Sequence, residues 1–124
     1  LMEREVVQIT AARIHGCDFC IAGHSAISLK KAGQTPDTVR ALQHGQPTDD
    51  AKLDAVAAFA TAVIATRGAV SDAEYQAFLA AGYNEQQALE VVLGISLATL
   101  CNFSNSLAGT PVNPQLTPYL PGAV

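Results

Sequence analysis

Two cysteines and a histidine lie close together near the start of the chain, at Cys17, Cys20 and His24. If this segment is helical, a rotation of about 100° per residue places the three side chains within about 60° of one another on one face. Residues three apart on a helix have Cβ atoms roughly 5–6 Å apart, which lets two thiols form a disulfide with little backbone adjustment. The spacing therefore predicts a dithiol that cycles between reduced and oxidised forms beside a proton carrier.

The expected electrostatics of this segment favour reactive thiols. A free cysteine has a pKa of about 8.5 and is mostly protonated at neutral pH, but a helix N-terminus or a nearby imidazolium lowers that pKa. Histidine side chains titrate near neutral pH, and His24 lies one turn after Cys20. His24 is therefore a candidate general acid/base, able to accept the thiol proton and return it to a leaving group.

Other uses of a cysteine pair fit the sequence less well. Two cysteines at helical spacing also suit a packed core. A structural zinc site usually has four ligands, and beyond the pair the chain offers only Cys101, His15 and His44. Covalent haem attachment requires histidine directly after the second cysteine, where this chain has Ile21, and a thioredoxin-type motif would follow a strand, which no segment predicts. We therefore expect no metal ion and no cofactor, and a dithiol on a helical scaffold.

Composition limits the partners and the compartment. Apolar residues make up 49% of the 124 residues and charged residues only 15%, which indicates that other subunits cover some of the apolar surface. The formal net charge of −4 offers no positive surface for nucleic acid or an anionic membrane, so we expect neither partner. Three cysteines, two of them in a CxxC, are typical of a catalytic or sensing thiol pair in a reducing compartment. We expect a single cytoplasmic domain.

Helix signals recur along the whole chain, and the predicted fold is an all-α compact bundle of about six helices. N-cap residues at Thr35, Thr48, Ser71 and Asn84 mark four of the helix starts. The predicted helices run from about Met2 to Ile14, from Cys17 to before Gly33, from Pro36 to Gly45, from the Thr48 cap to Arg67, from the Ser71 cap to Gly82, and from the Asn84 cap to Phe103.

Two apolar stretches, Ala55–Thr66 and Val91–Cys101, fall short of the ~20 residues that span a membrane, so both are predicted to be buried core helices. The last helix is apolar on nearly every side from Leu89 to Phe103, which predicts that it runs through the centre of the fold. Cys101, in this helix, is most simply a core residue.

The end of the chain differs in composition. Four of the six prolines follow Thr110, which precludes a continuing helix and favours an extended arm that packs along a surface, here that of a partner subunit. We therefore divide the chain into a helical domain at residues 1–110 and a proline-rich C-terminal arm at residues 111–124.

These residues carry a resemblance to a known family. Leu1–Glu5, Cys17–Cys20 and His24 resemble the alkylhydroperoxidase D-like branch of the carboxymuconolactone decarboxylase family. The pattern in that branch is a glutamate twelve residues before the first cysteine, a CxxC, and a histidine four residues after the second cysteine. Glu5, Cys17, Cys20 and His24 occupy all four positions. Similar segments follow at Gly33, Asn102–Asn105 and Gly109–Pro111.

The resemblance implies an all-α subunit in a homo-oligomer (dimer, trimer or hexamer) that reduces hydroperoxides with electrons from a dithiol protein or a small thiol. Cys20 would attack the peroxide oxygen and become a sulfenic acid, and Cys17 would resolve it to a disulfide. Glu5 and His24 would form the proton relay. The chain departs from the best-studied branch at Phe19, where that branch has another histidine.

The residues also leave open two functions other than that of a peroxidase. One is a non-catalytic oligomeric protein whose dithiol senses oxidants. The other is a lyase of the decarboxylase type, which would need an anion-binding pocket for which Arg4 and Arg13 are the nearest basic residues, and whose branch lacks the cysteine pair.

Several polar residues have simpler interpretations than a role in catalysis. Spacing alone makes Glu5 a solvated charge in the first turn of a helix, and only the resemblance gives it a relay role. His15 and His44 lie near helix ends, where a basic side chain stabilises the helix dipole. Asn102 and Asn105 either line the site or satisfy backbone groups.

Overall fold

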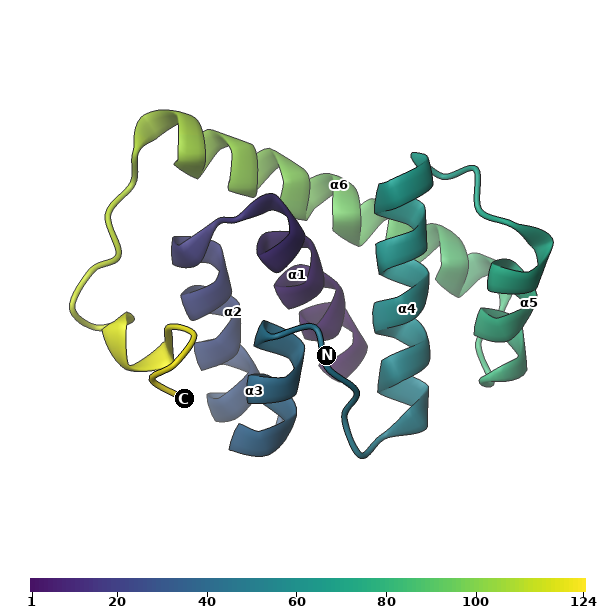
Figure 1. Cartoon of the computed structure of the whole chain (residues 1–124), viewed down its shortest axis with the longest axis horizontal. Helices are drawn as coiled ribbons and strands as arrows, with labels where there is room; N and C mark the ends of the chain where they lie inside the picture. Colours follow the sequence, from purple (N-terminus) through teal and green to yellow (C-terminus); the bar gives the residue numbers. More distant parts are fainter.

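The computed structural model describes all 124 residues as an all-α fold, as the helix signals predict. Six α-helices and one short 3₁₀ helix follow one another, with no strand between them (Figure 1). Their bounds are α1 Met2–His15, α2 Asp18–Lys30, α3 Pro36–Gln43, α4 Ala51–Thr66, α5 Asp72–Ala80, α6 Glu85–Ala108 and η1 Thr117–Tyr119.

Local sequence signals determine most of the helix starts. The Thr35 side chain accepts a hydrogen bond from the backbone of the first turn of α3. Ser71 and Asn84 each form a reciprocal capping box, with Glu74 and Gln87 as the third residues of α5 and α6. These side chains satisfy backbone N–H groups that have no partner within the helix.

The predicted cap of α4 is wrong by two residues. Asp50, not Thr48, caps the helix, and its carboxylate accepts hydrogen bonds from the backbone N–H groups of Lys52 and Leu53. The Thr48 backbone N–H and hydroxyl both donate to the Asp54 carboxylate at 2.8 Å. Since Thr48 is engaged with a side chain inside the helix, the nearer aspartate takes the cap position.

The core forms around α1, which packs against α2, α4 and α6. Val6, Val7 and Ile9 of α1 are at most 3% exposed. They join buried residues of α3, α4, α5 and α6, namely Leu42, Leu53, Val56, Phe59, Ala60, Val63, Phe78, Ala88 and Val91. The prediction that Ala55–Thr66 forms a core helix is confirmed by the buried face of α4. The central helix of the fold is therefore the first one, which carries Glu5.

The prediction that the last helix runs through the centre is wrong. α6 lies across the outside of the bundle, and only Ala88, Val91, Ala98 and Asn102 are buried along it (Figure 1). Val91–Cys101 is therefore not a core helix, and Cys101 is exposed. By length and composition alone α6 could cross a membrane, and only 17% of its apolar window is buried, although one such helix is weak evidence for a membrane protein. The apolar composition of a helix indicates that its surface is buried in the functional state, but it does not specify whether the same chain or another molecule covers that surface.

The C-terminal segment returns to its own chain. Gly109, in the left-handed conformation at φ 63°, ends α6. The segment then packs beside α2 and α3, where Gln43 Nε2 donates a hydrogen bond to the Tyr119 carbonyl at 2.8 Å and Lys30 Nζ lies 5.0 Å from the centre of the Tyr119 ring. The segment is thus a series of turns and a 3₁₀ helix packed on its own subunit and not an extended arm. The division at residue 110 stays a prediction.

Candidate active site

The cysteine pair lies at the turn between α1 and α2. Gly16, at φ 74°, ends α1 in the left-handed conformation that glycine adopts without strain. The chain then turns so that Cys17 becomes the N-cap of α2, and the Cys17 sulfur accepts a hydrogen bond from the Cys20 backbone N–H at 3.3 Å. The two cysteines form a disulfide with their Cα atoms 5.3 Å apart. The spacing therefore does place both sulfurs within bonding reach, at the positive end of a helix.

Both sulfurs lie in a small apolar cluster separate from the main core. Cys17 is 4% exposed and Cys20 is 6% exposed. Ala12 and Ile21 complete the buried cluster, and Phe19 packs against it from its edge. The pair is thus shielded from bulk water, which strengthens the effect of each hydrogen bond that reaches the sulfurs.

Glu5 and His24 meet although nineteen residues separate them in the chain. His24 Nδ1 lies 2.6 Å from Glu5 Oε2. The Glu5 side chain is 1% exposed, whereas that of His24 is 29% exposed. The expectation from spacing alone, a solvated charge at Glu5, is therefore wrong. Because Nδ1 faces the carboxylate, Nε2 is the imidazole nitrogen left free to exchange a proton.

The Glu5–His24 pair lies one helical turn from Cys20. His24 follows Cys20 by one helical turn on α2, a separation at which Cβ atoms are about 5–6 Å apart. Arg4 places a positive group near the same carboxylate, with Nε 3.5 Å from Glu5 Oε1, although its side chain is 66% exposed. The structure brings together a disulfide, an imidazole and a buried carboxylate, the groups that thiol redox chemistry with proton transfer requires.

α6 supplies one further side chain to this site. Asn105 Nδ2 lies 3.6 Å from the Cys20 sulfur and 2.9 Å from the Cys101 carbonyl oxygen. The sequence offered Asn105 only as one of two possible lining residues, because its spacing from the cysteines carries no periodic signal. The other, Asn102, is buried with its Oδ1 unpaired and contacts neither cysteine by a hydrogen bond.

The two spare histidines lie outside the site. His15, in the last turn of α1 as expected, packs edge-on against the Phe103 ring at 4.9 Å, and its Nε2 lies 3.3 Å from the Thr99 hydroxyl. His44 is the C-cap residue of α3. No group of three or more histidine, cysteine or acidic side chains has a metal-binding arrangement.

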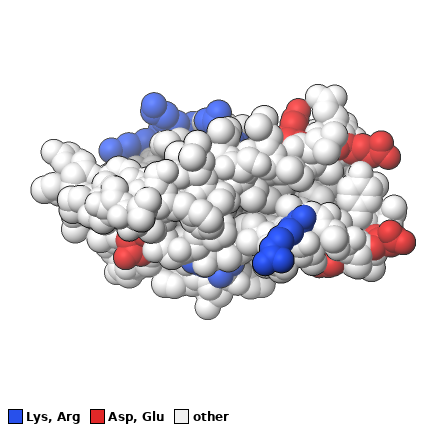
Figure 2. Space-filling model, turned by 90° about the horizontal axis from the view of Figure 1, so that it is seen from above, with Lys and Arg blue, Asp and Glu red and all other residues white.

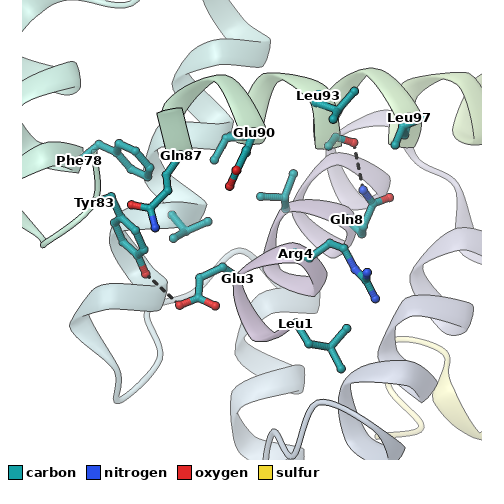
Figure 3. A pocket seen from close by; sticks show the side chains of 14 residues that line it. Leu1, Glu3, Arg4, Gln8, Phe78, Tyr83, Gln87, Glu90, Leu93 and Leu97 are labelled. Carbon is teal, nitrogen blue, oxygen red and sulfur yellow. Dashed lines mark hydrogen bonds between the residues drawn. The ribbon is translucent and has the colours of Figure 1, made fainter. Parts of the chain in front are cut away.

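One cavity lies away from the cysteines and is lined by none of them. It has a volume of about 440 Å³ and lies between the first half of α1, the first half of α6 and the turn before α6 (Figure 3). Its lining residues are Leu1, Glu3, Arg4, Val7, Gln8, Val56, Phe78, Tyr83, Gln87, Glu90, Val91, Leu93, Gly94 and Leu97. Its single basic residue is accompanied by two carboxylates, Glu3 and Glu90, so its charge does not favour the anionic substrate that a decarboxylase-type lyase needs.

One titratable group of the cavity is strongly perturbed. The Tyr83 hydroxyl donates a hydrogen bond to Glu3 Oε1 at 3.4 Å. Burial and the negative charge of Glu3 raise the pKa of Tyr83 to about 12. Tyr83 therefore stays neutral at physiological pH and cannot act there as a base.

Comparisons with known proteins agree with the fold and with the family resemblance. The sequence model of the carboxymuconolactone decarboxylase family matches residues 1–62, which include Glu5, both cysteines of the disulfide and His24. No protein of curated function matches the chain. Among solved structures, an uncharacterized peroxidase-related protein from Silicibacter sp. TM1040 matches 93% of this chain at 19% identity with a TM-score of 0.80. The chain spans 61% of the length of that protein, and at this identity the likeness shows a shared fold.

Proposed function

The chain belongs to the carboxymuconolactone decarboxylase family, and from this premise we propose that it is a thiol-dependent peroxidase that reduces hydroperoxides through a reversible disulfide. The observation that carries the proposal is the Cys17–Cys20 disulfide one helical turn from His24, whose Nδ1 faces the buried Glu5 carboxylate at 2.6 Å. The resemblance to the alkylhydroperoxidase D-like branch supports the same reaction.

In the first step the Cys20 thiolate attacks one oxygen of the hydroperoxide. A sulfur–oxygen bond forms as the oxygen–oxygen bond breaks, which leaves a sulfenic acid on Cys20 and an alkoxide. His24 protonates the alkoxide through Nε2 to give the alcohol, and the Glu5 carboxylate stabilises the imidazolium that precedes this transfer. Cys20 is assigned the attack because the resemblance implies it and because it lies one turn from His24.

In the second step the Cys17 thiolate attacks the sulfenic sulfur and expels hydroxide, which is protonated to water as the disulfide forms. The N-cap position suits this role because the Cys20 backbone N–H and the helix N-terminus stabilise negative charge on the Cys17 sulfur. A dithiol protein or small thiol then returns two electrons and two protons through thiol–disulfide exchange.

The same proposal includes a cytoplasmic homo-oligomer. The reducing compartment follows from the need to regenerate the dithiol after each turnover. The assembly would cover the outer face of α6, where Leu89, Leu93, Leu97, Leu100, Phe103 and Leu107 are more than half exposed. Figure 2, which views the molecule from the side of α6, shows a broad uncharged surface with most charged side chains toward its edges. An apolar surface of this kind marks an interaction site in a folded protein.

The decisive experiment is peroxide-dependent consumption of a dithiol. Purified protein is mixed with dithiothreitol and either hydrogen peroxide or cumene hydroperoxide, and the loss of peroxide is followed over many equivalents. We expect turnover that Cys20→Ser and Cys17→Ser both abolish, and that the control variant Cys101→Ser retains. Oxidation that stops after one equivalent of peroxide with excess dithiol present would contradict an enzyme and support a redox sensor.

A further inference from the structure

One side chain of α6 touches the reacting sulfur. Asn105 Nδ2 makes two contacts, at 2.9 Å to the Cys101 carbonyl oxygen and at 3.6 Å to the Cys20 sulfur. The second distance lies within the range of an N–H···S hydrogen bond, since sulfur is larger than oxygen. Cys20 is otherwise surrounded by apolar side chains in its cluster.

The carbonyl contact determines which way the Asn105 amide faces. A carbonyl oxygen only accepts hydrogen bonds, so the atom 2.9 Å from it must be the amide nitrogen and not the amide oxygen. That nitrogen carries two hydrogens, and one of them is used by the Cys101 carbonyl. The other is free to point at the Cys20 sulfur, which makes Asn105 a donor to that sulfur.

We propose that Asn105 is a catalytic hydrogen-bond donor that stabilises the Cys20 thiolate and holds its sulfur in place for attack on the peroxide. This inference deepens the proposed peroxidase function and rests on it. A donor stabilises the charged thiolate more than the neutral thiol, and the effect is large where water is excluded, as it is around the 6% exposed Cys20. Asn105 would thus stabilise negative charge on the Cys20 sulfur, as the helix N-terminus does on the Cys17 sulfur.

A purely structural role does not account for the second contact. Ser96, also on α6, donates to the carbonyl of Val92, four residues earlier, at 2.9 Å and makes no other side-chain hydrogen bond. Asn105 makes that same bond to Cys101 and adds the sulfur. Ser96→Ala is therefore a matched control, because it removes the backbone bond on the same helix and leaves the cysteines untouched.

The test measures the thiolate without peroxide. Cys17→Ser and Cys101→Ser together leave Cys20 as the single thiol, and its thiolate fraction is read from absorbance at 240 nm and from the rate of alkylation by iodoacetamide. In this background Asn105→Leu is expected to lower the thiolate fraction at pH 7 about tenfold, which corresponds to the loss of one charge-stabilising hydrogen bond of about 1.4 kcal/mol. Asn105→Asp, which places a carboxylate at the sulfur, is expected to lower it further.

The pH dependence separates this role from a structural one. The deficit should vanish at a pH high enough to ionise Cys20 in every variant, whereas a distorted site would stay slow at all pH values. Asn105→Ala, which removes the donor and favours the helix, provides a second variant if Asn105→Leu does not fold. An unchanged thiolate fraction in the folded variants, or an equal loss in Ser96→Ala, would overturn the proposal. Absence of peroxide turnover in the unaltered protein would instead contradict the proposed function, and the alkylation rates would still report on Asn105.

Discussion

Replacement of Glu5 and His24 by glutamine, singly and together, tests whether the two residues act as one proton relay. Glutamine keeps nearly the volume of glutamate and removes its charge, and at position 24 it removes the titrating ring. The pair suits a double-mutant cycle because its members touch at 2.6 Å. Residues in contact show an interaction energy, which the cycle isolates from the effects of each residue alone.

The expected size of the coupling in stability follows from the burial of the pair. A hydrogen bond to a charged group contributes about 1.5–3 kcal/mol, and Glu5 is 1% exposed, so little solvent screens it. His24→Gln leaves the carboxylate with Arg4 at 3.5 Å, and because Arg4 is largely exposed it compensates only in part. We therefore expect His24→Gln to lower the free energy of unfolding by about 2 kcal/mol, and the double variant to lose less than the sum of the single variants.

The assays are urea unfolding at pH 7 and peroxide turnover with dithiothreitol. With a slope of about 1–3 kcal/mol per molar urea, the stability change moves the unfolding midpoint by about 1 M. Positioned proton transfer contributes about 10²–10⁴ in rate, so His24→Gln should reduce turnover by at least a hundredfold. Residues that act as a unit are not additive, so the double variant should turn over about as slowly as the slower single variant.

One combined result would refute the relay. If the rate losses of the two single variants multiply in the double variant while all proteins stay folded, Glu5 and His24 act on different steps. A folded Glu5→Gln variant with full turnover would show that the carboxylate is only a structural partner of the imidazole.

Three other predictions follow from the site and the surface. After mild peroxide treatment, mass spectrometry should show the loss of two thiols with Cys101 still reduced, and Cys17→Ser should allow a sulfenic acid to be trapped on Cys20. A sulfenic acid trapped on Cys17 in Cys20→Ser would reverse the assignment of the attacking and resolving thiols. Light scattering under reducing conditions should give a mass of at least two subunits. Leu100→Glu on the outer face of α6 should lower that mass with little effect on the stability of the subunit fold, since this side chain is 65% exposed. A stable monomer of the unaltered protein at micromolar concentration would contradict the predicted oligomer. Burial and the charge of Glu3 raise the pKa of Tyr83 from 10.0 to about 12, so folding favours the neutral phenol. The stability that this preference contributes is complete below pH 10 and is lost as the pH rises toward 12. The free energy of unfolding should therefore decrease less steeply over that pH range for Tyr83→Phe, and equal slopes would contradict the shift.

The cysteine site was largely predictable from the sequence because its geometry is local. Cys20 and His24 lie on α2 and Cys17 is its N-cap residue, so contacts within one helix and its first turn bring the three together. Helix starts at Ser71 and Asn84 were predictable for the same reason, since a cap is a contact between residues three apart. The spacing of Glu5 from the cysteines identified it only through the family resemblance, because no local rule connects residues on two different helices.

Only the tertiary structure decided which residues of different helices contact one another. The sequence shows that α6 is apolar, but whether such a helix is central or lies on the outside depends on which helices pack around it, and here α1 takes the centre. The burial of Glu5 against His24 and the contact of Asn105 with Cys20 join residues nineteen and eighty-five positions apart. Helical periodicity determines which residues share a face, whereas contacts between helices depend on packing of the whole chain, and for that reason the sequence specified the dithiol while the fold supplied its partners.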